Sequence, residues 1–290
     1  MLLNDLKTVS ELLSESLTLA EEFGVSEYNI KLLLAEIIGC SIPSLPLNLN
    51  QKLTPLQLLQ FSAYRKDLLL HKPIQYILGK TEFYGLVLKV NENVLIPRPE
   101  TEGLVEWIVF NEKGKLRILD VGTGSGAIAL ALKNLNPDFN VSATDISHLS
   151  ITTARENAKL LCLDVHFVCT DLFQENKIMY DVIVSNPPYI SPGDYAILDD
   201  EVRLYEPKLA LLAKQNGLEF YHRILKQAST RLRKGGKIYL ETGETQSDEI
   251  VEIAHSCGYD RIEAKKDLTG RNRYLCIYNK DILTKRHIPD

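Results

Sequence analysis

Residues 98–283 alternate between short apolar segments and helical ones, and this alternation restricts the possible folds more than any other feature of the chain. The segments with the length and character of β-strands cover residues 116–121, 140–145, 165–169, 180–185, 237–241, 261–264 and 274–278. The helical stretches cover residues 102–111, 127–134, 148–161, 217–232 and 247–256. Apolar strands separated by helices predict a parallel sheet that is covered by helices on both faces.

The last two predicted strands are an exception to the parallel arrangement. Only residues 265–273 separate them, which is too short a connection for a helical crossover, so we expect this pair to be antiparallel. The chain thus predicts an α/β fold with a mostly parallel, seven-stranded sheet that ends in an antiparallel hairpin. This layout resembles the Rossmann-like sheet of class I S-adenosylmethionine-dependent methyltransferases rather than that of a dehydrogenase.

The N-terminal part of the chain has a different pattern. Apolar residues recur at helical spacing along residues 1–72, and Thr54-Pro55 has the composition of a helix start, so we expect a small helical bundle. Alternating apolar residues and turn residues predict a β-hairpin linker at residues 73–97. A catalytic domain at residues 98–283 and a flexible tail at 284–290 would follow. The bundle could dock a protein substrate or serve as a structural lid.

The composition of the 290 residues excludes several classes of protein. Apolar residues make up 45% and charged residues 24%, as in ordinary globular proteins. The formal charge of −5 argues against direct nucleic-acid binding and against a polybasic membrane binder. The sequence contains no long apolar run and no secretory signal. Because the cysteines and histidines are scattered, we expect neither a metal site nor structural disulfides, and we therefore expect a cytoplasmic protein. We also expect a monomer.

A glycine-rich turn follows the first predicted strand of the sheet. It reads Gly122-Thr123-Gly124-Ser125-Gly126 and leads directly into a helix. Glycines allow backbone N–H groups to approach a ligand closely, and a helix N-terminus favours the anionic end of that ligand. The spacing G-x-G-x-G differs from the dinucleotide-binding G-x-G-x-x-G, and the sequence contains no P-loop motif, so dehydrogenase and nucleotide-hydrolase functions are disfavoured.

Asp145 lies nineteen residues after Gly126, at the end of the second predicted strand. A carboxylate at this place can bind both hydroxyls of a ribose, as in other open α/β sheets. The alternative is a helix N-cap, because a predicted helix begins just after Asp145. Together with the glycine-rich turn, Asp145 indicates an adenosine-containing cofactor at the carboxyl ends of the strands.

The sequence Asn186-Pro187-Pro188-Tyr189 follows the fourth predicted strand. Its two prolines stiffen the loop and remove two N–H donors, which leaves carbonyl groups free to accept hydrogen bonds. The side-chain oxygen of Asn186 and the backbone carbonyl of Pro187 can therefore receive the two hydrogens of a planar –NH₂ group, and Tyr189 can lie against the face of that group. Holding a weakly nucleophilic amide or amine in this way would direct its lone pair toward an electrophilic methyl group.

These motifs together resemble those of the peptide chain release factor glutamine N5-methyltransferases. The resemblance covers almost the whole chain and rests on residues 73–79, 83–85, 95–102, 122–126, 186–189 and 205–207. The segment NPPY is also found in DNA adenine N6-methyltransferases, whereas RPETE at residues 98–102 is not. Ribosomal-protein glutamine methyltransferases tend to read Arg-Ser-Pro where this chain has Arg98-Pro99-Glu100, which favours the release-factor branch.

The resemblance implies a role for each motif. S-adenosylmethionine would be bound by Gly122, Thr123, Gly124, Ser125, Gly126, Asp145, Asp171, Leu172 and Asn186. Asn186, Pro187, Pro188 and Tyr189 would hold the glutamine of the Gly-Gly-Gln motif of a class I release factor, with Asn186, Pro187 and Tyr189 acting in catalysis. Some family members carry tryptophan where this chain has Leu172, so adenine packing would be aliphatic here.

Three alternatives to this function stay open at the level of the sequence. They are a glutamine methyltransferase acting on a ribosomal protein, a DNA or RNA adenine N6-methyltransferase that holds a flipped base, and an inactive adenosine-binding adaptor. The acidic balance argues against the second, and the intact NPPY segment argues against the third. The sequence also leaves the roles of Glu100, Glu102 and Glu241 undecided between the site and the structure.

Overall fold

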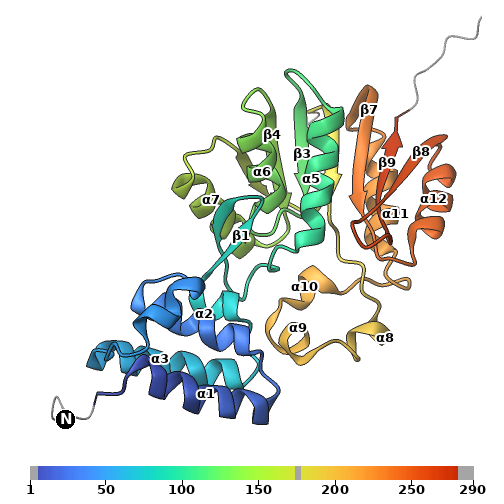
Figure 1. The fold of residues 1–290 in the computed structure, drawn as a ribbon. Coiled ribbons are helices and arrows are strands. Elements are labelled where there is room, and N and C mark those ends of the chain that lie inside the picture. Colours follow the sequence, from blue (N-terminus) through green and yellow to red (C-terminus); the bar gives the residue numbers. More distant parts are fainter. Residues whose placement is uncertain (1–5, 174–177, 280–290) are drawn as a thin grey trace, which may run out of the picture. The chain divides into compact units, whose positions relative to one another are not determined.

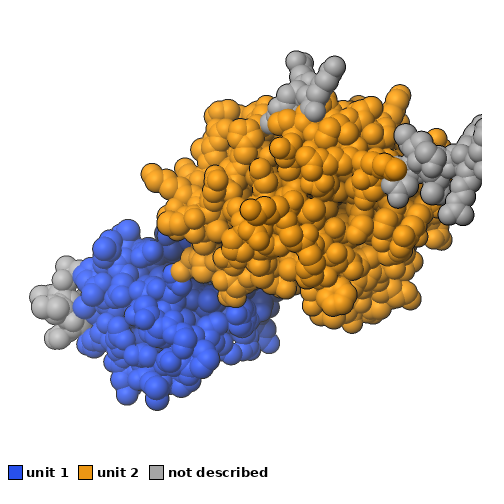
Figure 2. Space-filling view, turned by 90° about the horizontal axis from the view of Figure 1, so that it is seen from above, with its two compact units in different colours: residues 1–79, 199–205 blue, residues 80–198, 206–290 orange. Residues whose placement is uncertain are grey.

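The computed structural model describes residues 6–173 and 178–279 (Figure 1). The chain forms two compact units, which Figure 2 colours separately. Unit 1 consists of Met1–Gly79 with Asp199–Tyr205, and unit 2 consists of Lys80–Leu198 with Glu206–Asp290. The first division thus falls at Gly79, inside the predicted linker at residues 73–97. The predicted tail at residues 284–290 lies outside the described residues.

Unit 1 is helical, as the spacing of its apolar residues predicts. Its elements are α1 (Val9–Phe23), α2 (Glu27–Ile38), the 3₁₀ helix η2 (Ile42–Asn48), α3 (Pro55–Leu69), α4 (Ile74–Leu78) and α9 (Asp200–Tyr205). Thr54 caps α3 in a capping box with Gln57, and Pro55 is the first helical residue, which confirms the predicted helix start. The hydroxyl of Tyr205 donates a hydrogen bond of 2.7 Å to the carbonyl of Leu70 and so ties α9 to the end of α3.

Unit 2 contains the predicted seven-stranded sheet. Its strands are β3 (Arg117–Val121), β4 (Asn140–Asp145), β5 (His166–Cys169), β6 (Tyr180–Ser185), β7 (Leu232–Glu241), β8 (Arg261–Lys266) and β9 (Asn272–Tyr278). They lie in the order β5-β4-β3-β6-β7-β9-β8. The pairs from β5 to β7 are parallel, and β9 is antiparallel to both β7 and β8, as the short last connection predicts.

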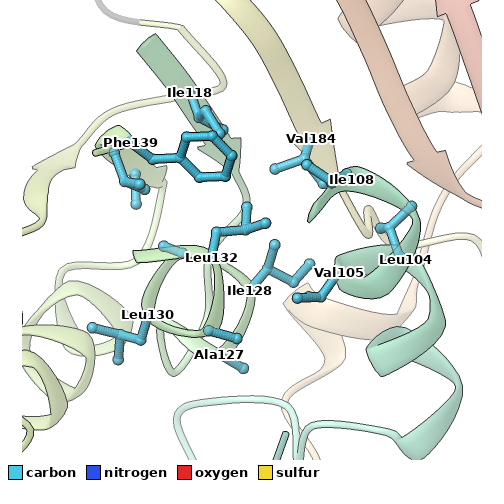
Figure 3. Packing of buried hydrophobic residues seen from close by; sticks show 14 of the residues in the cluster. Leu104, Val105, Ile108, Ile118, Ala127, Ile128, Leu130, Leu132, Phe139 and Val184 are labelled. Carbon is cyan, nitrogen blue, oxygen red and sulfur yellow. The ribbon is translucent and has the colours of Figure 1, made fainter. Parts of the chain in front are cut away.

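Helices cover both faces of this sheet. Unit 2 contains α5 (Pro99–Asn111), α6 (Ala127–Leu135), α7 (His148–Leu160), α8 (Pro192–Tyr195), α10 (Lys208–Leu211), α11 (Glu219–Ala228) and α12 (Ser247–Ser256). Alternate strand residues such as Ile118 and Leu119 belong to two different buried clusters, because successive side chains of a strand point to opposite faces. One cluster packs against α5, α6 and α7, and Figure 3 shows part of it; the other packs against α11 and α12.

The predicted β-hairpin is present, and its strands belong to unit 2. It comprises β1 (Lys80–Phe83) and β2 (Leu86–Lys89), and its buried residues Phe83, Leu86 and Leu88 join the cluster around α5, α6 and α7. Asn157 of α7 anchors β2 by accepting a hydrogen bond of 2.7 Å from the N–H of Lys89 and donating one of 3.0 Å to its carbonyl.

Three predicted boundaries differ from the structure by three residues or more. The helix expected at residues 217–232 ends at Ala228, and β7 begins at Leu232 instead of residue 237. An irregular pairing explains the second difference, because Leu232 already pairs with Tyr180 before the register shifts between Tyr180 and Val182. The helix expected from residue 102 begins at Pro99, which places Thr101 in its first turn.

Candidate active site

The carboxyl ends of the parallel strands enclose a cavity of about 370 Å³ in unit 2. β3 and β6 are neighbours in the sheet, but the connection after β3 leads to β4 and the connection after β6 leads to β7 on the opposite side. Open α/β sheets bind ligands at such a point. Of the residues that the sequence assigns to the site, the cavity is lined by Gly122, Gly124, Asp145, Asp171, Leu172, Asn186, Pro187 and Pro188. Thr123, Ser125, Gly126 and Tyr189 are not part of this lining.

The glycine-rich turn has the backbone conformation that requires glycine. Gly122, Gly124 and Gly126 have φ values of 75°, 56° and 86°, in the left-handed region that other residues rarely adopt. A Cβ atom on Gly126 would also lie 3.1 Å from a methyl carbon of Leu130 and 3.2 Å from Cβ of Ala154. The turn can therefore run close to the sheet and present its backbone to the cavity.

Several N–H groups of this turn already have partners within the fold. Those of Gly122 and Thr123 donate hydrogen bonds of 2.8 and 2.9 Å to the carbonyl of Thr144, and that of Gly124 donates one of 2.9 Å to Oδ2 of Asp145. The turn is thus fastened to the end of β4. The turn contributes to the cavity mainly by bringing its backbone close to it, because most of its N–H groups already donate to partners in the protein.

A buried carboxyl group lies beneath the turn and was not identified from the sequence. Oδ2 of Asp120 accepts hydrogen bonds of 2.6 Å from the hydroxyl of Thr123 and 3.2 Å from the N–H of Ala129. Burial raises the pKa of Asp120 to about 7, although these two hydrogen bonds oppose the rise. The only sequence signal is an acidic residue inside the apolar strand Ile118–Val121.

Asp145 lines the cavity and does not cap the following helix. Its Oδ1 accepts a hydrogen bond of 2.8 Å from the N–H of Ser147, but the N-cap of α7 is Ser147 itself, whose hydroxyl accepts from the N–H of Ser150. Burial raises the pKa of Asp145, and backbone hydrogen bonds from Ser147 and Gly124 oppose the rise. Each carboxylate oxygen can accept a further hydrogen bond, so Asp145 can still bind hydroxyl groups.

Asp171 and Leu172 lie at the same cavity beside two residues that sequence reasoning missed. Nη2 of Arg223 lies 2.5 Å from Oδ2 of Asp171, and the guanidinium of Arg223 lies 5.5 Å from the ring centre of Phe220. Both Arg223 and Phe220 come from α11 and line the cavity. Leu172 has a φ of 60°, and the hydroxyl of Thr144 holds its carbonyl at 2.7 Å.

The loop after β6 is held at its far end by backbone and side-chain contacts. The N–H of Ile190 donates to the carbonyl of Leu211, and the carbonyl of Ile190 accepts from the N–H of Ala213. Nε2 of Gln246 donates a hydrogen bond of 3.1 Å to the carbonyl of Tyr189. Gly217 lies against this contact, and a Cβ atom there would meet the Tyr189 carbonyl oxygen at 2.1 Å.

The side chain of Tyr189 packs against the buried cluster that also contains Leu119, Val121 and Tyr221. Burial raises the pKa of its hydroxyl, and the nearby Glu241 carboxylate adds to the rise. Pro188, which precedes Tyr189, lines the cavity instead. The contact expected between Tyr189 and the face of the substrate amide stays a prediction.

Asn186 has a defined partner on the side away from the cavity. Its Nδ2 donates a hydrogen bond of 3.1 Å to the hydroxyl of Thr101, which is buried in the first turn of α5. This contact joins the RPETE and NPPY segments. Thr101 and Asn186 are 85 residues apart in the sequence, so no local pattern in either segment could have identified this contact.

Arg98 and Glu102 use their side chains in contacts within the fold, and Glu100 uses its backbone carbonyl. Nη2 of Arg98 lies 2.5 Å from Oε1 of Glu206, so two of the motif segments meet in an ion pair whose carboxylate is buried and whose guanidinium is partly exposed. Oε1 of Glu102 accepts a hydrogen bond of 2.6 Å from the N–H of Tyr84 in the hairpin turn. The carbonyl of Glu100 accepts a hydrogen bond from the hydroxyl of Tyr274. For Glu102 the structural interpretation is therefore the better one.

Residues 6–173 and 178–279 contain no group of three His, Cys, Asp or Glu side chains placed to hold a metal ion. Over the same residues, no single helix is long and apolar enough to cross a membrane, and the one pair that passes this test jointly, Glu27–Ile38 with Ile42–Asn48, is bent by 69°.

Comparison with known proteins shows similarity along most of the chain. Residues 12–79 match the family described as "PrmC N-terminal domain", and residues 101–200 match "Methyltransferase small domain". The release factor glutamine methyltransferase of Streptococcus pneumoniae is 47% identical over 73% of this chain and 77% of its own length. That of Enterococcus faecalis is 38% identical over 92% of this chain and 98% of its own length.

Solved structures share the fold at lower sequence identity. A methyltransferase from Pyrococcus furiosus is 20% identical, with a TM-score of 0.53 over 75% of this chain and 98% of that chain. A 16S rRNA N2 G1207 methyltransferase from T. Thermophilus, solved in complex with AdoMet and guanosine, is 17% identical, with a TM-score of 0.51 over 69% of this chain and 50% of that chain.

Proposed function

The chain belongs to the family of release factor glutamine methyltransferases, and we propose that it methylates the side-chain amide nitrogen of the glutamine in the Gly-Gly-Gln motif of a class I peptide chain release factor. The methyl donor in this proposal is S-adenosylmethionine. Release factors act in translation, so we place the reaction in the cytoplasm. The position of Asn186, with its amide nitrogen turned away from the cavity toward Thr101, supports this reaction most directly.

The described residues fit S-adenosylmethionine. Asp145 would accept hydrogen bonds from the ribose hydroxyls, and Asp171 would face the exocyclic amine of the adenine. Leu172, Phe220 and Ile224 supply apolar surface for the adenine ring, so Phe220 offers an aromatic face where Leu172 offers an aliphatic one. When bound, the donor supplies a methyl group on a positively charged sulfur and is converted to S-adenosylhomocysteine.

Asn186 and Pro187 would position the substrate. An amide nitrogen is a poor nucleophile because its lone pair is delocalised into the carbonyl group. Hydrogen bonds from its two hydrogens to Oδ1 of Asn186 and to the carbonyl of Pro187 would hold the nitrogen at the cavity and direct its reacting face to the methyl group. A new bond forms between the nitrogen and the methyl carbon, the bond between that carbon and sulfur breaks, and the nitrogen releases a proton to water.

Unit 1 would supply the surface that recognises the folded release factor. It exposes large apolar side chains on η2 and α3, namely Leu47, Leu56 and Leu59, which are 88%, 75% and 71% exposed. A stable contact between two proteins buries about 800 Å² on each, which is more than a catalytic loop provides. Exposed apolar residues of this size are suitable for such a contact.

Each substrate alternative makes a distinct prediction in one assay. The protein and radiolabelled S-adenosylmethionine are incubated in three parallel reactions. One contains a class I release factor, one a ribosomal protein and one duplex DNA. The proposed function requires transfer of label to the release factor well above the other two. Transfer to the ribosomal protein or to DNA in place of the release factor would contradict it.

A further inference from the structure

We propose that Glu241 is a positioning residue whose carboxylate, together with the hydroxyl of Thr101, sets the orientation of the Asn186 side-chain amide. The inference rests on the proposed function, because it concerns the residue that would hold the substrate amide. Neither Glu241 nor Thr101 is among the residues that line the cavity. Their effect on the reaction would therefore pass through Asn186.

The fold brings the three side chains together from distant parts of the sequence. Ser185 pairs with Leu240 in the parallel ladder between β6 and β7, so the following residues, Asn186 and Glu241, leave the two strands side by side. Thr101 reaches the same place from the first turn of α5. Thr101 is 4% exposed and Glu241 is 2% exposed, so their polar groups depend on partners within the protein.

The direction of the hydrogen bonds gives the amide its orientation. The two ends of an asparagine amide have nearly the same shape, so only its partners decide which end faces the cavity. Nδ2 of Asn186 donates to the hydroxyl oxygen of Thr101, which leaves the hydroxyl proton of Thr101 to be donated onward. A carboxylate can only accept, and the Glu241 carboxylate is near enough to Thr101 and Asn186 for both to lower its pKa. Its buried Oε2 has no hydrogen-bond partner among the described residues, so it is free to accept a hydrogen from this pair. The carbonyl end of Asn186 is thereby left for the substrate.

Protonation of Glu241 would remove the preference of the Asn186 amide for this orientation. Burial raises the pKa of Glu241 to about 7, while the hydrogen bonds from Thr101 and Asn186 and the charge of Arg273 oppose the rise. The other titratable groups around it are Glu100 on α5, Tyr189 after β6, Tyr221 on α11 and Tyr274 on β9. A protonated carboxyl group, or a glutamine in its place, can donate to the carbonyl oxygen of Asn186 and favour the inverted amide.

The first test compares Glu241→Gln with the wild-type protein at saturating release factor. We expect kcat to fall about 10–100-fold, the size of effect seen when the hydrogen-bond partner behind a metal ligand is removed, while the affinity for S-adenosylmethionine measured by calorimetry stays within about twofold. We also expect the wild-type kcat to decrease as the pH falls through about 7 and the variant to lack this dependence. A variant with wild-type kcat and the wild-type pH profile would overturn the inference.

Thr101 provides a matched pair that does not alter the buried charge. Thr101→Val keeps the shape but removes the hydroxyl, and Thr101→Ser keeps the hydroxyl. We expect the valine variant to lose kcat and the serine variant to retain most of it. Equal kcat for the two would overturn the inference even if Glu241→Gln proves too unstable to assay.

A measurement without substrate separates this inference from the proposed function. In protein labelled with ¹⁵N at asparagine, the side-chain –NH₂ signals of Asn186 report its hydrogen bonding directly. We expect them to shift in Glu241→Gln and, in the wild-type protein, to titrate near pH 7. Unshifted signals would refute the positioning role, whereas a failure of the wild-type protein to methylate a release factor would refute the function alone.

Discussion

At the scale of single residues, the cavity divides its polar groups between two ligands. Asp145 ends β4 and Asp171 follows β5 on one side of β3, while Asn186 and Pro187 follow β6 on the other side. The glycine-rich turn after β3 lies between them. The proposed cofactor and the proposed substrate would therefore depend on different side chains, and substitutions should separate the two binding events.

Asp145→Ala tests the cofactor side. Removal of the carboxylate takes away the proposed acceptor for the ribose hydroxyls and the acceptor for the N–H of Gly124. We expect the affinity for S-adenosylmethionine to fall about tenfold or more, since a hydrogen bond to a charged group contributes roughly 1.5–3 kcal/mol. Calorimetry measures this, with Asp164→Ala, a substitution of an exposed aspartate outside the cavity, as the control. Unchanged affinity in Asp145→Ala would mean that Asp145 serves only the glycine-rich turn.

Site residues that lie in a recognisable motif at the end of a strand were identified from the sequence more readily than residues whose role depends on a tertiary contact. Asp145 and Asn186 follow predicted strands and were identified, and both line the cavity. Thr101, Arg223 and Phe220 were not, because each reaches the site region from a helix whose position depends on tertiary packing. Tyr189 was assigned from its neighbours in the motif; its side chain is partly buried and packs against the cluster around α11 and α12, and its predicted role is untested.

At the scale of elements, the loop after β6 depends on a glycine in a distant segment. Gly217 has a φ of 87°, and a Cβ atom there would lie 2.1 Å from the carbonyl oxygen of Tyr189 and 2.3 Å from Nε2 of Gln246. Both atoms belong to the hydrogen bond that holds the end of the loop. A side chain at this position would force the loop to move.

Gly217→Ala should therefore lower both stability and activity. We expect a loss of about 2–4 kcal/mol in the free energy of unfolding, from backbone strain and displacement of the Tyr189 carbonyl, and a clear decrease in kcat. Gly258→Ala is the matched control, because Gly258 has a φ of 92° but a Cβ atom there would meet no other atom within 4 Å. Denaturant unfolding and kcat compare the two; equal effects would show that only strain matters at Gly217.

The sheet was predictable because its strands are apolar along their length and its last connection is short. The start of β7 was not, since the irregular pairing of Leu232 with Tyr180 reflects tertiary structure and has no local pattern. The hairpin was recognised from its alternation, but its membership of unit 2 depends on Phe83, Leu86 and Leu88 packing into the cluster around α5, α6 and α7. The short helices α8, α9 and α10 have no extended periodicity that would predict them.

At the scale of the whole molecule, two buried carboxyl groups make stability depend on pH. Burial raises the pKa values of Asp120 and Glu241 to about 7, above ordinary values of 3.8 and 4.5. The folded state thus binds these protons more tightly than the unfolded state. The resulting stabilisation is fully present below the ordinary pKa values and is lost as the pH rises to about 7.

We therefore expect the protein to be more stable near pH 5.5 than near pH 8, by roughly 2 kcal/mol for each carboxyl group, since one pKa unit corresponds to about 1.4 kcal/mol. Denaturant unfolding at constant ionic strength measures the difference. Glu241→Gln and Asp120→Asn should each reduce it. A difference that is absent in the wild-type protein, or unchanged in both variants, would contradict this account of the buried carboxyls.

Unit 1 can be tested as the docking surface without removing it. Leu56→Asp with Leu59→Asp replaces two exposed side chains of α3 and should change stability by less than about 1 kcal/mol. We expect the double variant to raise KM for the intact release factor severalfold and to leave methylation of a short Gly-Gly-Gln peptide unchanged. Leu160→Asp, which alters an exposed leucine of α7 in unit 2, is the control. An unchanged KM in the double variant would argue against docking on α3.

The position of the transferred methyl group tests the central claim most directly. A class I release factor is treated with the protein and methyl-labelled S-adenosylmethionine, digested and sequenced by tandem mass spectrometry, with Asn186→Ala as the matched variant. The account predicts one labelled methyl group on the side-chain nitrogen of the Gly-Gly-Gln glutamine, formed about 10²–10³ times more slowly by the variant. A methyl group on another residue, or equal rates for the two proteins, would contradict it.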